Sequence, residues 1–194
     1  MTRVVLATHN AHKVDELRAI LEDALAGIEL VGYDGPEPVE DGATFAENAL
    51  IKARAAAAHT GLAALADDSG ISVDALDGAP GIHSARFAGT RDDADNRALL
   101  LERLEGVSDR SARFVCAAAF VAPSGFEHVE VGEWPGAVLR EARGAGGFGY
   151  DPIFAPAGST KSAAELTSDE KNAVSHRTLA FSALMPVVRE RASA

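Results

Sequence analysis

The first residue along the chain that could take part in binding or catalysis is a lysine close to the N-terminus. Lys13 ends the pattern Thr8-x-Asn10-x-x-Lys13, which joins an apolar run predicted as a strand, Val4 to Ala7, to a helical pattern. Free backbone N–H groups and a lysine at a helix N-terminus favour the binding of a phosphate group. The alternative is that Asn10 only caps the helix and Lys13 is solvated, since the segment has neither a P-loop nor a dinucleotide-binding glycine pattern.

Acidic residues follow a second predicted strand, Leu62 to Ala66, in the segment Asp67 to Gly70. Two adjacent carboxylates at the end of a buried strand are costly unless water, a cation or a backbone group receives them. With Glu40-Asp41 they would form an oxygen-rich cluster suited to Mg²⁺, which takes one or two carboxylates together with phosphates and waters. The alternative is a turn before a short strand at Ile71 to Val73, in which both aspartates accept backbone N–H groups.

Two later segments have groups that suit a flat aromatic ring. The glycine-rich segment Gly146 to Asp151 would let the backbone approach a ring, with Phe148 as a stacking face and Asp151 as an acceptor. A hairpin loop is the alternative. Ser175-His176-Arg177 supplies donors for a carbonyl group on a base, and the alternative is a helix start with exposed polar residues.

Alternating helices and strands are predicted to position these groups. Thr44 and Glu47 have the spacing of a capping box, and they open an Ala-rich helix that ends near Gly61. On that helix Lys52 shares a face with Asn48, so its side chain either projects over a pocket or is solvated. Further elements are predicted as helices at Asp92 to Glu105 and from Ser175 on, and as strands at Arg113 to Val121 and Glu127 to Glu133. This interleaving favours an α/β fold with a mixed sheet.

Composition and charge exclude several classes of protein. The 194 residues carry 18 Lys+Arg against 29 Asp+Glu, a formal net charge of −11, which argues against broad docking on nucleic acid or an anionic membrane. Hydrophobic residues at 47% and charged residues at 24% are typical of a globular chain. No apolar run approaches the ~20 residues of a membrane helix and no secretory signal pattern opens the sequence, so we expect a cytoplasmic protein. The single cysteine, Cys116, is expected to be buried.

Six motifs along nearly the whole chain resemble those of the inosine triphosphatase family, the pyrophosphatases of non-standard purine nucleoside triphosphates. In order they are T-x-N-x-x-K, E-D-G-x-T-F-x-E-N-A-x-x-K-A, A-D-D-S-G, G-A-P-G-I-H-S-A-R-F-A-G, G-G-F-G-Y-D-P-I-F and E-K-N-A-V-S-H-R. The resemblance implies one domain, residues 1–194, with an elongated mixed β-sheet, flanking helices and two lobes around a central nucleotide-binding cleft. It also implies a homodimer that requires Mg²⁺ and hydrolyses inosine, deoxyinosine and xanthosine triphosphates to the monophosphate and pyrophosphate, which cleanses the nucleotide pool.

The resemblance assigns roles to individual positions of this chain. Asp68 corresponds to the catalytic acidic residue and, together with Glu40, to the Mg²⁺ ligands. The substrate-binding positions are Thr8, His9, Asn10, Ala11, His12, Lys13, Lys52, Ser69, Phe148, Gly149, Tyr150, Asp151, Lys171, His176 and Arg177. The chain departs from residues that are frequent in the family at His9 and His83.

The roles combine into an expected reaction. Asp68 orients or deprotonates a water that attacks the α-phosphorus, while Lys13, Lys52 and Lys171 neutralise charge on the leaving pyrophosphate. Donors from His176, Arg177 or backbone amides meet the 6-oxo group of the base. Two other functions stay open: a non-catalytic regulator that binds purine nucleotides, and a nucleoside triphosphatase that releases orthophosphate.

Overall fold

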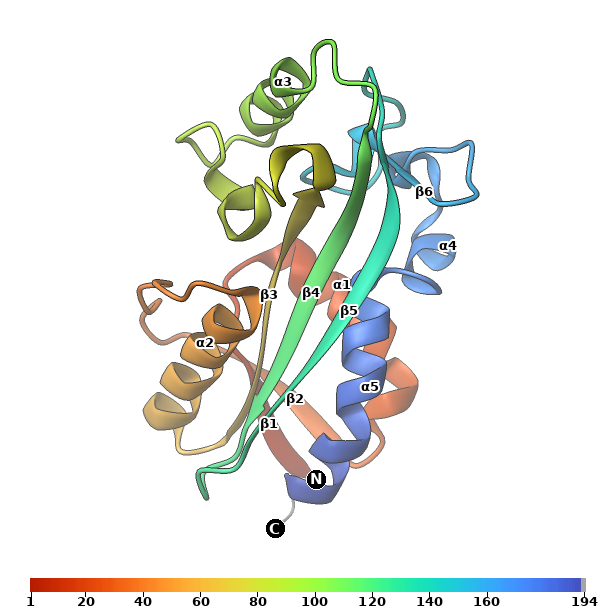
Figure 1. Ribbon diagram of the computed structural model, residues 1–194. Coiled ribbons are helices and arrows are strands. Elements are labelled where there is room, and N and C mark those ends of the chain that lie inside the picture. The colour runs from red at the N-terminus through yellow and green to blue at the C-terminus, as the bar shows by residue number, and fades with distance from the viewer. Residues whose placement is uncertain (193–194) are drawn as a thin grey trace. The chain divides into compact units, whose positions relative to one another are not determined.

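The computed structural model describes residues 1–192, except for the side chains of Ala11, His12 and Asp23, and shows an α/β fold. Its six-stranded sheet has the order β2-β1-β3-β4-β5-β6 (Figure 1). The strands are β1 Thr2–Leu6, β2 Ile28–Gly32, β3 Ala63–Val73, β4 Ser111–Val121, β5 Glu127–Val138 and β6 Phe154–Pro156. The α-helices are α1 Ala11–Leu21, α2 Phe45–Thr60, α3 Asp93–Arg103, α4 Ser168–Asn172 and α5 His176–Arg191. Because β1 pairs in parallel with β2 and β3 while β5 and β6 pair antiparallel, the predicted mixed sheet is confirmed.

The chain divides into two compact units, and the three long strands contribute residues to both. The first unit contains Met1–Asp68, Cys116–Gly132 and the chain from His176 on. The second unit contains Ser69–Val115 and Glu133–Ser175. Strand β3 passes from the first unit to the second between the last acidic residue of the Asp67 to Gly70 segment and the serine after it.

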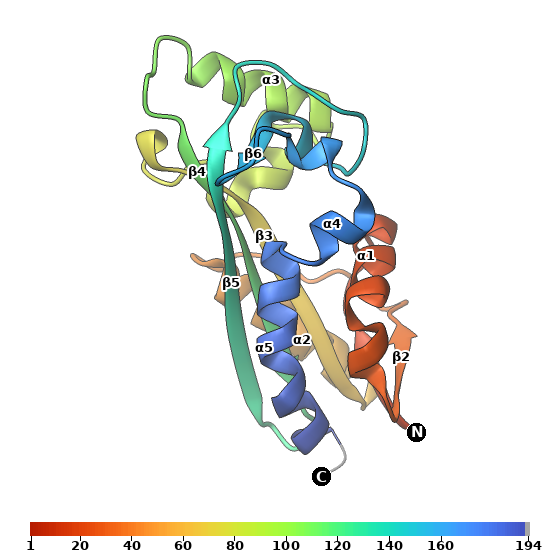
Figure 2. The same cartoon turned by 90° about the vertical axis from the view of Figure 1, so that its right-hand side faces the viewer.

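In the first unit, helices cover both faces of the sheet. The alternation of side chains along β1 sends Val4 and Leu6 towards α1 and α5, and sends Val5 towards α2 (Figures 1 and 2). Helix α2 packs with the small side chains of Ala49 and Ala53, which are fully buried. Its capping box is formed as the sequence predicts. The opposite face also contains the fully buried Cys116.

The core of the second unit is built around aromatic rings. Phe154 lies 4.5 Å from Phe114 and 5.6 Å from Trp134 between ring centroids, and Leu100 of α3 joins the same cluster. Helix α3 confirms the prediction for Asp92 to Glu105. Its buried face includes Asn96, whose side chain accepts from the Ala88 N–H and thereby ties the helix to the preceding loop.

Two predictions about local structure are wrong, and one element was missed. The turn expected at Asp67 to Gly70 is part of the continuous strand β3, because the buried aspartates have charged partners instead of backbone N–H groups. A Cβ at Gly70 would clash with Ser84 Oγ and the Gly81 carbonyl, so this glycine permits a close approach rather than a turn. Strand β2 was not predicted. The start of α5 is buried rather than exposed, since Ser175, His176 and Arg177 are all buried.

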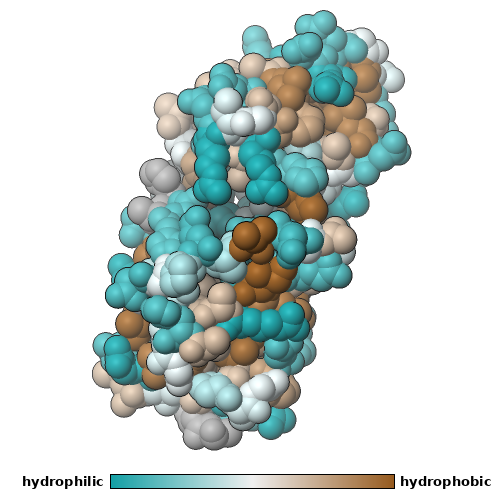
Figure 3. Space-filling view, turned by 90° about the vertical axis from the view of Figure 1, so that its left-hand side faces the viewer, coloured by the Kyte–Doolittle hydropathy of each residue, from teal (hydrophilic) through white to brown (hydrophobic). Residues whose placement is uncertain are grey.

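The surface agrees with the composition. Figure 3 shows mostly hydrophilic side chains on the face that it displays, with hydrophobic side chains in separate groups. Among the described residues, no helix combines the length and the apolar character that crossing a membrane requires.

Candidate active site

The segment between β1 and α1 places a lysine against a buried aspartate in the first unit. Asn10 caps α1, with its Oδ1 3.3 Å from the Lys13 N–H, as the sequence predicts. The solvated alternative for Lys13 is wrong: its side chain is only 14% exposed, and its Nζ lies 2.9 Å from Asp67 Oδ2. The helix cap and the ion pair together fix the lysine at the N-terminus of α1, where the helix dipole also favours an anion.

Asp67 belongs to a buried ionic network that also includes α5. Arg177 donates from Nη1 to Glu16 Oε2 at 2.7 Å, and its Nε lies 3.4 Å from Asp67 Oδ2. Burial alone would raise the pKa of Asp67, but Lys13 and Arg177 outweigh it and hold this pKa well below the usual range. Asp67 is therefore ionised, and its contacts with Lys13 and Arg177 give it a structural role between two cations.

The second acidic residue of the pair, Asp68, faces a different lysine. Lys52 Nζ lies 3.3 Å from Asp68 Oδ1 and 3.2 Å from Glu40 Oε2, and its side chain is 15% exposed, so the solvated alternative is wrong here too. Burial lowers the pKa of Lys52, but the negative charges of Asp68, Asp67 and Glu40 outweigh it and the pKa is raised. Lys52 is a fixed cation that two carboxylates share.

Asn48 is a site residue that the sequence analysis did not assign. Its Oδ1 accepts from the Gly42 N–H at 2.9 Å, and its Nδ2 donates to Asp68 Oδ2 at 3.3 Å. It thus ties the loop that follows Glu40 to the middle of β3. The shared helical face of Asn48 and Lys52 was the available signal, but the partner lies 20 residues away in sequence.

The pKa of Asp68 is raised by burial, against the lowering effect of Lys52 and Lys13. Glu40 and Asp67 add to the increase because they are negatively charged neighbours. A carboxylate with a raised pKa is a better proton acceptor than an ordinary aspartate, provided that it stays ionised near neutral pH.

The acidic residues fit part of a Mg²⁺ site. Glu40 and Asp68 both pair with Lys52 Nζ, so their carboxylate oxygens lie close together and carry two negative charges against one positive charge. Such hard oxygen atoms are the ligands that Mg²⁺ prefers. Within the described residues there is no group of three or more His, Cys, Asp or Glu that could hold a metal ion. Two carboxylates suit Mg²⁺ only when phosphate oxygens and waters complete its coordination.

In the second unit, a glycine-rich loop presents Phe148 beside a buried ion pair. Asp151 Oδ2 accepts from Lys171 Nζ at 2.8 Å and from the Phe148 N–H at 3.0 Å. Lys171 Nζ also lies 5.1 Å from the centroid of the Phe148 ring. The loop lies in the connection between the antiparallel strands β5 and β6, so the hairpin-type alternative describes its place in the fold, and stacking on Phe148 stays a prediction.

The other residues of this loop are anchored by their neighbours. The Tyr150 hydroxyl donates to the Ser84 carbonyl at 2.8 Å, which gives this buried side chain a structural role. Gly149 is held through both of its peptide groups by Asp93 and Arg97 of α3. These two α3 residues are a second omission of the sequence analysis, because no local pattern connects them to a loop more than fifty residues away.

The remaining predicted positions lie near these clusters in sequence. Thr8 Oγ1 accepts from the Asn10 N–H at 3.2 Å, and His9 Nδ1 lies 3.3 Å from Glu37 Oε1. Ser69 directly follows Asp68 on β3, and His176 is buried at the start of α5. The side chains of Ala11 and His12 lie outside the described part of the structure.

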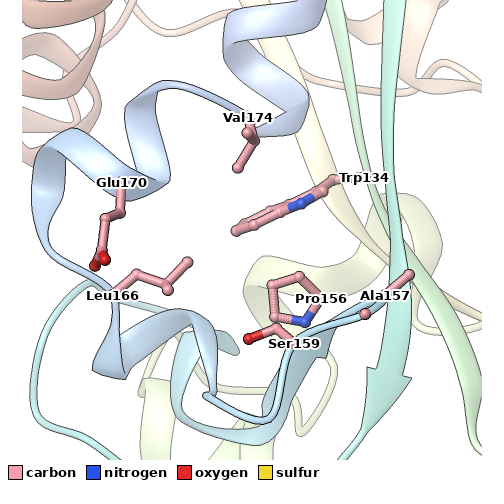
Figure 4. A pocket seen from close by; sticks show the side chains of 8 residues that line it. Trp134, Pro156, Ala157, Ser159, Leu166, Glu170 and Val174 are labelled. Carbon is pink, nitrogen blue, oxygen red and sulfur yellow. The ribbon is translucent and has the colours of Figure 1, made fainter.

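A separate pocket of about 330 Å³ in the second unit contains none of the predicted site residues. Figure 4 shows the Trp134 indole between Val174 and Pro156. The Glu170 carboxylate at its edge already accepts from the Thr167 N–H and lies 3.6 Å from Lys161 Nζ. The candidate functional residues therefore lie in two separate groups, the lysine–carboxylate cluster of the first unit and the Phe148 loop of the second unit.

Comparison with known proteins shows the family of this chain. The model of the Ham1 family matches residues 4–187. The chain belongs to the Ham1 family. A dITP/XTP pyrophosphatase of Leifsonia xyli is 59% identical, over 97% of this chain and 96% of that protein.

Solved Ham1 structures extend the similarity to the fold. A HAM1 protein from Coxiella burnetii has a TM-score of 0.89 at 44% identity, and covers 98% of this chain and 100% of its own. A nucleoside-triphosphatase / dITP/XTP pyrophosphatase from Mycobacterium abscessus has a TM-score of 0.78 at 49% identity, with coverages of 96% and 100%. The family resemblance drawn from the sequence motifs is confirmed.

Proposed function

We propose that this Ham1 chain hydrolyses non-standard purine nucleoside triphosphates, among them deoxyinosine, inosine and xanthosine triphosphates, to the monophosphate and pyrophosphate. The observation that carries the proposal is the buried cluster in which Lys13 and Lys52 contact the adjacent aspartates of β3. Relatives named dITP/XTP pyrophosphatase, at up to 59% identity over nearly the full chain, support the choice of substrate.

The lysines of the first unit suit the triphosphate. Lys13 and Lys52 are held by ion pairs before any substrate binds, so little side-chain entropy is lost when they meet phosphate oxygens. Their partial burial strengthens the attraction to an anion relative to bulk water. Cations fixed in advance stabilise the charge that grows on the leaving pyrophosphate.

Asp68 is the proposed proton acceptor. It takes a proton from water as the water oxygen forms a bond to the α-phosphorus, and the bond from that phosphorus to the bridging oxygen of the β-phosphate breaks. The electron pair of this bond leaves with pyrophosphate. The raised pKa of Asp68 and its contacts with Lys52 and Asn48 suit a positioned base.

Magnesium dependence is part of the same proposal. Glu40 and Asp68 would hold the ion through carboxylate oxygens, and substrate phosphates would complete the site. When bound, Mg²⁺ supplies charge neutralisation to the phosphate oxygens. Lys52, which lies between these carboxylates, keeps them oriented.

The Phe148 loop of the second unit suits the purine. The aromatic face of Phe148 can stack on a purine. The Lys171 ammonium lies beside this ring, so we assign it to the 6-oxo group of the base instead of to the leaving pyrophosphate. Adenine presents an amino group at the same position, which would leave donors unpaired.

A homodimer, which the family resemblance implies, belongs to this proposal and is tested by size-exclusion chromatography with light scattering.

Product analysis tests the proposed function. With Mg²⁺ and inosine triphosphate we expect pyrophosphate and inosine monophosphate, and a kcat/KM up to about 10⁴-fold above that for adenosine triphosphate. The products are separated by anion-exchange chromatography, with the metal chelated in a control. Orthophosphate as the first product would favour the triphosphatase, and binding without any product would favour the regulator.

Gly147→Ala is expected to impair the base-binding loop. Gly147 has a φ of +67°, and a Cβ there would collide with Asp151 Oδ2, the oxygen that receives both Lys171 and the Phe148 N–H. We expect KM for inosine triphosphate to rise at least about tenfold, because a charge-assisted hydrogen bond is lost. Steady-state kinetics measure the change.

Gly158→Ala is the matched control for this substitution. Gly158 has a similar φ of +77°, but no atom lies within 4 Å of the position of its Cβ. It should suffer the same backbone strain, about 1 kcal/mol, and keep the wild-type KM. Equal KM values for the two variants would contradict the role given to the Asp151 oxygen.

A further inference from the structure

Two charged residues of α3 form hydrogen bonds with the backbone of the Phe148 loop. Asp93 Oδ2 accepts from the Gly149 N–H at 2.7 Å, and Arg97 Nη1 donates to the Gly149 carbonyl at 2.7 Å. Asp93 and Arg97 are one helical turn apart, so a single helix face meets both peptide groups of one residue. Both bonds are short and each has one charged partner, which makes them stronger than neutral hydrogen bonds.

The space beside the Gly149 Cα is open. Gly149 has a φ of +59°, and no atom lies within 4 Å of the position that its Cβ would occupy. The residues on either side are fixed differently, Phe148 through its N–H to Asp151 and Tyr150 through its hydroxyl to Ser84. The Asp151 N–H also donates to the Phe148 carbonyl at 3.2 Å, so Asp93 and Asp151 hold the peptide between Phe148 and Gly149, and Arg97 holds the next peptide.

We infer that Asp93 and Arg97 are positioning residues for the purine, which set the orientation of Phe148 and of the Gly149 backbone without touching substrate themselves. This inference rests on the proposed function and deepens it, since it names what determines base affinity. A stacked ring loses affinity when the loop samples several orientations, because binding must then order it. The triphosphate ligands lie on other elements, in the first unit, and are unaffected.

Arg97→Met tests the inference, because it removes the donor and keeps most of the apolar stem. We expect KM for inosine triphosphate and Kd for inosine monophosphate to rise about tenfold, the loss of one charge-assisted hydrogen bond. We expect Kd for pyrophosphate and kcat to change by less than about twofold. Asp93→Ala should repeat this pattern, and Arg97→Lys should recover most of the affinity because it restores a donor.

The matched control is Arg113→Met. Arg113 forms an exposed pair with Asp74 in the same unit, at 2.8 Å, away from the loop. It should keep both dissociation constants, and thermal melting shows that each variant is folded.

Three outcomes would overturn the inference: an unchanged Kd for inosine monophosphate in both Arg97→Met and Asp93→Ala, an equal rise in Kd for pyrophosphate, or a folded Arg97→Lys that recovers nothing. The dissociation constants also separate the inference from the proposed function. If the wild type binds inosine monophosphate but releases no pyrophosphate from the triphosphate, the proposed function fails while the comparison of the two dissociation constants still decides the role of Asp93 and Arg97.

Discussion

Asp68→Asn is expected to lower kcat for inosine triphosphate by about 10²–10⁴-fold, the contribution of a general base. The amide has nearly the same shape and still offers an oxygen to Lys52, but it cannot take a proton from water. It also removes one of two carboxylates available to Mg²⁺, and both effects act in the same direction. Single-turnover kinetics at saturating substrate measure the loss.

The control for this variant is Asp74→Asn. Asp74 is an aspartate of the second unit whose carboxylate forms an exposed pair with Arg113, and its neutralisation should leave kcat unchanged. The melting temperature of Asp68→Asn should equal or exceed that of the wild type, since the pKa of Asp68 is raised by burial and the neutral form is easier to bury. A folded Asp68→Asn protein with near-normal turnover would show that another group activates the water.

Arg177→Met is expected to have the largest effect on stability. The side chain is almost completely buried and pairs with both Glu16 and Asp67, so its removal leaves two buried carboxylates without this cation. Removing one partner of a buried ion pair lowers the free energy of unfolding by about 3–5 kcal/mol. Urea denaturation followed by circular dichroism measures the change in the free energy of unfolding.

Arg54→Met is the matched control in the first unit. Arg54 makes a two-bond contact with Glu127, at 2.7 Å and 2.6 Å, but the pair is exposed. An exposed ion pair contributes less than about 1 kcal/mol, so this variant should unfold close to the wild type. A similar stability for Arg177→Met and the wild type, with a raised KM, would instead support direct contact between Arg177 and the substrate.

Patterns confined to one element predicted much of the fold. The capping box of α2, the helical pattern of α3 and the long apolar strand β4 are all local signals, and all are confirmed. The turn expected at Asp67 to Gly70 is wrong because the partners of the aspartates come from other elements. Local composition therefore suggested a turn where tertiary charge pairing stabilises a strand.

Motif order suggested most of the candidate site residues, whereas their physical environments needed the structure. Lys13 meets its partner 54 residues along the chain, and Arg177 meets Glu16 across 161 residues. No pattern in a window of helical length contains such pairs. The same reason explains why Asn48, Asp93 and Arg97 were not assigned, since each acts through a partner in a distant segment.

The buried cysteine has a practical consequence for experiments on this chain. Burial raises the pKa of the Cys116 thiol, and the nearby charge of Asp67 raises it further, so the native thiol is protonated and shielded. Electrophilic reagents that label thiolates reach Cys116 only when the core of the first unit opens. Because the sequence has a single cysteine, the rate at which a thiol reagent labels the unmodified protein measures how often that core opens. Motion of the Phe148 loop does not contribute to this rate.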